Sequence, residues 1–571
     1  MTSRLTGFLS CAVPALLMLA CGLVLPAHLR SVDASVLREA GRHTPTLIAH
    51  GLRLVQQDNL GAAQLLLAAA REENLPECQT LALAVTNLAR EHPGWSVWGG
   101  GDARLERLFG SDPELPKART EPLTDFLVRE DNRAVALELL RLSPFPAVQE
   151  LLRCRALTNT VIFSPSQSAS GQALDTALAG CGLLLQREHL SGGLSNAVFR
   201  LAVASNHGGD PQGLEQVLLD LMSLGQRFNW GQMVGFVGQI QDPETLRRLA
   251  TLVRRSEGQL PVLFAAVHLS GQPAPVAAYL MNFSRTGLPD LGASLRFGAG
   301  GINELLRRNE RLSADRFSRQ AGEPTLAGAV LSLAADLCWR LPRLGLTIKW
   351  LLYLGGGFLL AAALHFARPT PSTLERPLQV RGFHVAREML FALGFLLVVL
   401  LLSEPFLAQE SQRVEFPFRL RLPTVGSAAR AGAISVNRSF MNQLSLLTLL
   451  LFFVLQALIY TACLVKLAEI RRQHLPSRIK LKLLENEDHL FDAGLYLGFA
   501  GTIISLILVS LGVIQPSLMA AYSSTSFGII FVSVFKIFHL RPARRKLLLE
   551  TEAGAAEDRA PVVGARLATP S

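Results

Sequence analysis

The amino-acid sequence predicts an all-α membrane protein, with a polytopic helical membrane region preceded by an exported helical domain. Of its 571 residues, 49% are hydrophobic and only 18% are charged, and the apolar excess falls after residue 325. Residues 30 to 320 show helical periodicity interrupted by short Gly, Pro and Asp turns, with almost no strand-like alternation. Several later apolar runs are long enough to cross a bilayer. This composition excludes a single soluble enzyme.

The first 27 residues have the pattern of an export signal. Arg4 precedes an apolar core from Gly7 to Leu25, and Pro26 and Ala27 follow it. This order is typical of either a cleaved signal peptide or an uncleaved signal anchor, and the sequence leaves both open. In either case the segment that follows is expected to leave the cytoplasm.

Residues 28–325 are expected to form the exported helical domain. Thr44 and Pro45 have the residue types of an N-cap and a first helical position, which predicts a helix from there to Gln57. A second helix is predicted over residues 61–71. This helix pair, with small residues at its crossing, resembles a tetratricopeptide-type unit.

Three helix starts marked by proline recur at a spacing of 32 residues, at Asp210-Pro211, Asp242-Pro243 and Ala274-Pro275. A fixed period of this size is typical of stacked helical pairs of the tetratricopeptide or HEAT kind. The alternative is an irregular helical domain in which three helix starts coincide with this spacing. Both interpretations give an all-α layer, and neither gives chemistry.

Apolar runs predict three transmembrane helices before a final hairpin, at Thr347–Ala367, Met389–Phe406 and Leu444–Val465. The run Leu326–Cys338 is too short to span and is expected to lie on a surface or to pack in the domain. Lys349 stands near one end of its span, from which its side chain can extend to the interface. With the signal retained, the number of crossings is even, so both termini are expected in the cytoplasm.

The net charge of +10 comes from Lys and Arg that gather beside the apolar spans. That placement fits the positive-inside bias of membrane proteins better than nucleic-acid binding, which is not expected. The predicted divisions are a signal or anchor at 1–27, the exported domain at 28–325, three transmembrane helices at 326–466 with an outer loop at 409–443, a basic cytoplasmic loop at 467–491, a hairpin at 492–540, and a basic end with a disordered tail at 541–571.

The outer loop holds the strongest alternation in the chain, VEFPFRLRL at Val414–Leu422. Such a segment is either a strand that pairs with a partner or with the N-terminal domain, or a loop that rests on the bundle. Arginines in this loop run against the positive-inside bias.

The segment 492–540 is predicted to be a tight transmembrane hairpin, because two apolar spans meet at Gln515-Pro516 with almost no linker. Small residues let helix backbones approach closely, and hydroxyls hydrogen-bond across helices or line a wet path. The residues of these two kinds include Gly498, Gly501, Thr502 and Ser505 on the first arm and Ser524, Thr525 and Gly528 on the second.

GFAGT, with Gly498, Gly501 and Thr502, and STSFG, with Thr525 and Gly528, resemble the pore hairpin of the MotA/TolQ/ExbB family of inner-membrane ion-channel subunits. The resemblance implies that Thr502 and Thr525 face a pore, with Ser505 and Ser524 beside them. It also implies a homo-oligomer around a single-span partner of the ExbD/TolR/MotB type, whose aspartate carries the proton. The ExbB and TolQ branch has an acidic residue where this chain has Ala520.

Other chemistry is not evident. The sequence has no P-loop, nucleophile elbow, zinc-protease helix or dinucleotide fingerprint, so neither an enzyme nor a cofactor or metal site is expected. Glu404 and Asp492 are ionisable groups near membrane depth and are functional candidates, with interfacial placement in water as the alternative. In an oxidising compartment Cys78, Cys154 and Cys181 form one disulfide or stay as buried thiols.

Two functional hypotheses result. The first is a channel-like energy-transducing subunit that couples ion flow to an envelope process. The second is a membrane-anchored helical-repeat scaffold that binds an extracytoplasmic protein without transport. Both place the chain in the cell inner membrane, as a multi-pass protein with a large periplasmic domain.

Overall fold

The computed structural model describes residues 2–102, 121–313, 326–367, 383–404, 443–473, 475–510 and 518–557. The chain divides into two compact units. Unit 1 contains Met1–Arg30 and Pro342–Ser571, and unit 2 contains Ser31–Leu341. The N-terminal segment therefore packs with the C-terminal membrane helices, although hundreds of residues separate them in the sequence.

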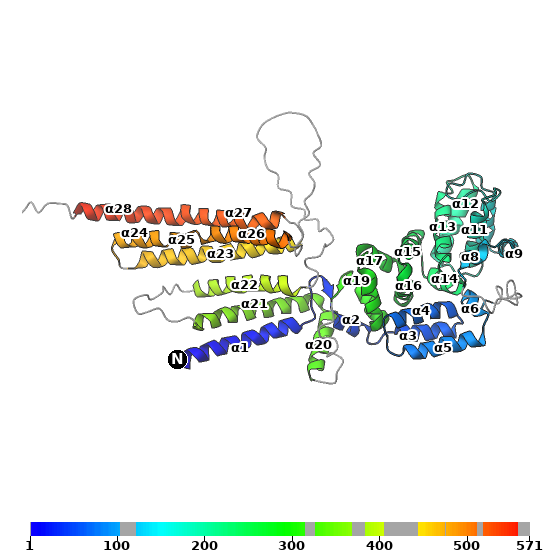
Figure 1. Ribbon diagram of the computed structural model, residues 1–571, viewed down its shortest axis with the longest axis horizontal. Helices are drawn as coiled ribbons and strands as arrows, with labels where there is room; N and C mark the ends of the chain where they lie inside the picture. The colour runs from blue at the N-terminus through cyan, green and yellow to red at the C-terminus, as the bar shows by residue number, and fades with distance from the viewer. Residues whose placement is uncertain are drawn as a thin grey trace, which may run out of the picture. The chain divides into compact units, whose positions relative to one another are not determined.

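Unit 2 is helical almost throughout (Figure 1). Its described residues contain one ladder, in which β1 (Ser31–Val32) pairs in parallel with β2 (Arg311–Leu312). The predicted all-α class is confirmed. The α-helices are α2 (Ala34–Gly41), α3 (Leu47–Gln56), α4 (Leu60–Glu72), α5 (Cys78–Glu91), α6 (Trp95–Trp98), α8 (Leu123–Val128), α9 (Glu130–Arg141), α10 (Pro146–Arg153), α11 (Gln172–Gln186), α12 (Gly192–Asn206), α13 (Gln212–Gly225), α14 (Trp230–Val237), α15 (Pro243–Arg255), α16 (Leu260–Ser270), α17 (Pro273–Asn282), α18 (Gly287–Ser294), α19 (Gly298–Arg308) and α20 (Leu326–Arg340).

The first predicted helix start is wrong by two residues. The N-cap of α3 is Thr46, whose hydroxyl accepts a hydrogen bond from the Ala49 amide, and not Thr44. The Thr44 hydroxyl instead accepts from the Gly300 amide at 2.9 Å, at the start of α19. The Thr44 side chain, which the local sequence predicted as the N-cap, is therefore used in a contact with a distant segment.

Of the three predicted helix starts, Pro243 begins α15 as predicted, whereas α13 begins at Gln212, directly after Pro211, and α17 begins at Pro273, two residues before Pro275. The observed starts are therefore 31 and 30 residues apart rather than 32. α13 packs on α15, and α15 packs on α17. The intervening helices α14, α16 and α18 also contact one another in chain order. The rings of Phe228, which precedes α14, Phe236 on α14 and Phe264 on α16 pack against one another, with centroids 5.1 to 5.9 Å apart. A true repeat stays a prediction, because the pattern covers only this part of unit 2.

Unit 1 is a bundle of long helices. α1 (Thr2–Val24), α21 (Pro342–Ala367) and α22 (Phe383–Ser403) lie side by side, and α22 contacts α23 (Gln443–Arg472) (Figure 1). α23 in turn packs on α26 (Ala493–Ser510) and α27 (Leu518–Phe535), which contact each other along their length.

Four helices in the described parts of the chain are long and apolar enough to cross a membrane. They contain Leu5–Val24, Pro342–Phe366, Leu449–Arg472 and Tyr522–Glu552. In the first hairpin arm the apolar stretch Ala493–Ile503 is shorter. These helices agree with a membrane protein and with four of the predicted spans; the remaining crossings and their direction stay predictions.

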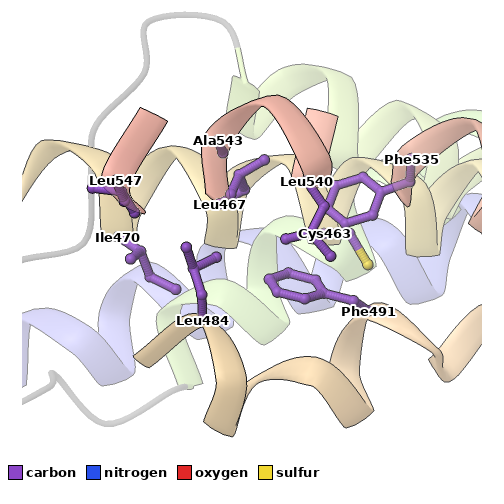
Figure 2. Close-up of a cluster of buried hydrophobic side chains, with 9 residues drawn as sticks. All are labelled: Cys463, Leu467, Ile470, Leu484, Phe491, Phe535, Leu540, Ala543 and Leu547. Carbon is purple, nitrogen blue, oxygen red and sulfur yellow. The ribbon is translucent and has the colours of Figure 1, made fainter. Parts of the chain in front are cut away.

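The α23/α26/α27 group continues at one end into a helical extension, which we call the helical cap (Figure 1). It is made of α24 (Ser477–Asn486), α25 (Asp488–Phe491), a π-helical turn (Lys536–Leu540) and α28 (Arg541–Glu557), together with the end of α23. Figure 2 shows nine buried side chains of these elements pointing toward one another. They are Cys463, Leu467, Ile470, Leu484, Phe491, Phe535, Leu540, Ala543 and Leu547. This apolar core joins the predicted basic loop 467–491 to the hairpin.

Several predictions concern parts of the chain outside the described residues. These are the alternating segment Val414–Leu422, the hairpin turn at Gln515-Pro516, Ala520 as a side chain, and the tail beyond residue 557.

Candidate functional site

The two arms of the hairpin approach each other closely at Gly498. A Cβ atom at this position would lie 2.8 Å from the Ser524 carbonyl oxygen and 3.4 Å from the Gly528 Cα. Only glycine leaves room for such an approach, because the neighbouring atoms belong to the opposite backbone. Gly501 fills the same role one turn further, where a Cβ would meet the Ser524 hydroxyl.

Three hydroxyls meet at this crossing. The Thr502 hydroxyl is in hydrogen-bond contact with that of Thr525, across α26 and α27. The Gly498 carbonyl accepts from Ser524 at 2.9 Å, from Thr502 at 3.1 Å and from Thr525 at 3.3 Å. Thr502 and Ser524 are buried, and Thr525 is half-buried. The residues that carried the sequence resemblance thus form one polar cluster, although the chain alone satisfies its hydrogen bonds.

A buried glutamine on α23 extends this cluster, and the sequence analysis missed it. The Gln456 amide donates to the Gly494 carbonyl at 2.9 Å. Its Oε1 is buried and lacks a hydrogen-bond partner among the described residues. A Cβ on Gly528 would lie 2.7 Å from that same Gly494 carbonyl. The available signal was a single amide in an otherwise apolar span, since such a group needs a partner in the bundle.

Two further polar pairs lie where the hairpin meets the helical cap. Asp492, one of the predicted candidates, forms an ion pair with Lys536 at 2.7 Å. The Tyr460 hydroxyl contacts the His539 Nε2 at 3.0 Å. Lys536 and His539 both belong to the π-helical turn, a form of backbone often found at functional sites. Ser505 lies on α26, but its side chain is outside the described residues.

The second predicted acid, Glu404, belongs to a separate cluster at the end of α22. Its carboxylate lies 3.7 Å from the Lys349 Nζ on α21, and both side chains are almost fully buried, at 0% and 1% exposure. The Lys349 Nζ donates to the Ala27 carbonyl at 2.5 Å. The Glu404 carboxylate accepts from the Leu29 amide at 2.8 Å, with the His28 ring at 3.7 Å.

This geometry corrects two expectations. Lys349 does not extend to an interface but points into the protein, toward Glu404 and the end of the N-terminal segment. Glu404 is not an acid placed in water. Burial of a single unpaired charge is costly. The Lys349 and Glu404 side chains therefore compensate each other's charge, and they also satisfy the polar backbone groups that follow α1. Sequence reasoning missed this pairing because the partners belong to three segments far apart in the chain.

In unit 2 the contacts between buried polar side chains have a structural role. His50 and His268 contact each other at 2.9 Å, and burial lowers the pKa of His268 to about 4. Cys78, Cys154 and Cys181 are free thiols, and burial raises the pKa of Cys181 to about 12. Within the described residues, no group of three or more His, Cys, Asp or Glu side chains is arranged to hold a metal ion.

Comparisons with family models, with characterised proteins and with solved structures find no match to this chain.

Proposed function

We propose that this chain is an integral membrane subunit of the channel-like, energy-transducing type, similar to MotA/TolQ/ExbB proteins. The observation that carries the proposal is the meeting of Thr502, Thr525 and Ser524 around the Gly498 carbonyl. The hydroxyl cluster, with Gln456 bound to Gly494 one turn away on α26, provides polar groups within otherwise apolar helices, as ion passage requires. The chain would assemble in the inner membrane as a homo-oligomer around a single-span partner that provides the titrating acid.

Retention of α1 is part of the proposed topology. Lys349 and Glu404 hold the backbone at Ala27 and Leu29, directly after this helix. α1 also packs closely on α21, since a Cβ on Gly22 would lie 2.6 Å from the Tyr353 ring. Cleavage after residue 27 would remove the Ala27 carbonyl that accepts a hydrogen bond from the buried Lys349. We expect mass spectrometry of the purified protein to find peptides from residues 5–27; a chain that begins after residue 27 would contradict an anchor.

Ion flux tests the proposed pore. The complex that co-purifies in mild detergent is reconstituted in liposomes, and proton entry is followed with a trapped dye under a potassium diffusion potential. Thr502→Val and Thr525→Val are expected to reduce flux at least tenfold, because each removes a hydroxyl while it keeps the side-chain volume. Thr502→Ser is the matched control and is expected to conduct. Proton flux in the Val variants equal to that of the wild type, or no flux in the wild type, would contradict the proposed pore.

The alternative function is a membrane-anchored scaffold, with unit 2 as the binding module. It is supported by the fact that Gly498 already accepts hydrogen bonds from all three hydroxyls, as a structural crossing would need. In that case the Val variants bind the same co-purifying proteins as the wild type. Native mass spectrometry separates the two functions. A ring of copies with a single-span protein supports the transducer, whereas a monomer or dimer with a soluble envelope protein supports the scaffold.

A further inference from the structure

Helix α20 (Leu326–Arg340) carries two apolar stripes, and only one of them is covered. Leu331, Ala335 and Cys338 follow one face at helical spacing, and all three are buried where α20 packs on α2. The Arg308 guanidinium donates to the Cys338 carbonyl at 3.1 Å and fixes the end of the helix. This face is therefore part of unit 2.

The second stripe consists of Val330, Leu333 and the half-buried Leu337, at steps of three and four residues, and it continues to Leu341, the residue between α20 and α21. Val330 is 63% exposed, Leu333 is 70% exposed and Leu341 is 53% exposed. At 100° per residue this stripe lies roughly 120° around the helix from the buried face. Isolated exposed apolar residues are common, but a continuous row indicates a surface with an occupant.

The remaining sector of α20 is polar. Ser332 is on it, together with Asp336 and Arg340, which form an ion pair at 2.8 Å. The Arg340 guanidinium also lies 6.0 Å from the centre of the Trp339 ring. An apolar stripe beside a charged sector, with Trp and Arg at one end, is the pattern of a helix that lies in a membrane interface.

The chain position of α20 identifies the occupant. Leu341 ends its stripe, and Pro342 begins α21, a helix long and apolar enough to span a membrane. The five residues 342–346 precede the predicted apolar core at Thr347, and as helix they rise roughly 7 Å. That is about the depth of a headgroup layer. The Leu341 end of the stripe therefore lies near the lipid surface wherever α21 spans, within reach of the interface for the rest of the helix.

We propose that the Val330/Leu333/Leu337/Leu341 stripe of α20 inserts into the lipid interface and holds unit 2 against the membrane. The proposal requires that α21 spans the bilayer, but it does not require a pore. The charged sector faces the headgroups and water, while the Leu331 face stays on α2. A second copy of the chain is the competing occupant.

Spin labels on the full-length protein in lipid nanodiscs test this. Labels are placed at Leu333→Cys and Val330→Cys, in a background in which the accessible Cys11, Cys21 and Cys78 are serine. Leu83→Cys, a position 67% exposed in unit 2, is the aqueous reference. Leu351→Cys, 65% exposed on α21, is the lipid reference. Collision with oxygen, which is concentrated in lipid, is compared with collision with a nickel chelate that stays in water.

We expect the ratio of oxygen to nickel collisions at 333 and 330 to be several-fold higher than at 83 and to approach that at 351. A water-like ratio at both α20 positions with a lipid-like ratio at 351 would overturn the proposal while α21 remains a span. Spin–spin broadening at 333 that disappears on dilution with unlabelled protein would also overturn it, since a second copy would then cover the stripe. A water-like ratio at 351 would remove the span and the proposal together.

Discussion

The two units bury their ionisable groups in different ways. In unit 1 the charges of Lys349 and Glu404 are enclosed almost completely and compensate each other across α21 and α22. In the described ion pairs of unit 2 the arginine keeps contact with water even where the carboxylate is enclosed, as for Asp102, 5% exposed, and Arg187, 35% exposed, and the contact between His50 and His268 is neutral. Enclosed charges make helix association conditional on every partner being present, whereas partly solvated ones tolerate a loss.

This difference shows which contacts determine how the helices of each unit pair. The helices of unit 2 are joined by apolar contacts between neighbours in the chain, such as the Phe228, Phe236 and Phe264 rings. The candidate membrane-spanning helices of unit 1 are mostly apolar, so lipid competes with the apolar contacts between them. Their pairing therefore depends on a few polar and small residues.

The largest expected effect is that of removing one enclosed charge. Lys349→Met leaves the Glu404 carboxylate buried with no cation at 3.7 Å, which should cost about 3–5 kcal/mol. The double variant Lys349→Met with Glu404→Gln should recover much of that loss, because no net charge stays buried. Thermal unfolding in detergent measures both. If Lys349→Met alone is as stable as the wild type, the pair is solvated, and the contrast between the units is lost.

The next effect concerns the small residues. Gly498→Val places side-chain atoms against the Ser524 carbonyl, so the hairpin arms must separate, at a cost of about 3 kcal/mol. Gly394→Ala on α22 is the control, since among the described residues an added Cβ there meets nothing closer than a Val454 methyl carbon at 3.7 Å. Proteolysis of the protein in detergent should reveal a loosened hairpin in the first variant alone. Equal protection of both would mean that the close approach does not stabilise the hairpin.

A pH effect is expected in unit 2. Burial lowers the pKa of His268 to about 4, below the value of about 6.5 in the unfolded chain. The unfolded state therefore binds more protons between these values, and stability falls as the pH is lowered through that window. From pH 7 to pH 5 the loss should be about 2 kcal/mol.

Hydrogen exchange at the amides of α16, which carries His268, measures this change. His268→Gln should remove most of the pH dependence while it keeps a polar side chain at the site. Exchange that is equally protected at pH 7 and pH 5 in the wild type would show that His268 is accessible to protons in the folded state. The interpretation of the contact between His50 and His268 as neutral and enclosed, which distinguishes unit 2 from unit 1, would then be wrong.

Much of the architecture follows from sequence alone. Helical periodicity determines the all-α class, and long apolar runs locate four helices able to span a membrane. The small residues of GFAGT and STSFG also predict a close crossing, because backbones approach only where no Cβ intervenes, and Gly498 has that role. These properties are local, so they are encoded within a few turns of helix.

Tertiary structure alone decided the partners of the polar groups. The local pattern placed Thr44 at a helix cap, but Thr44 binds the Gly300 amide, and Thr46 caps α3. It placed Lys349 at an interface, but Lys349 binds Ala27 and pairs with Glu404. Gln456 meets Gly494 only because α23 packs on α26. A buried polar group must find a partner, and which distant segment provides it is determined by how whole helices pack rather than by the residues beside it.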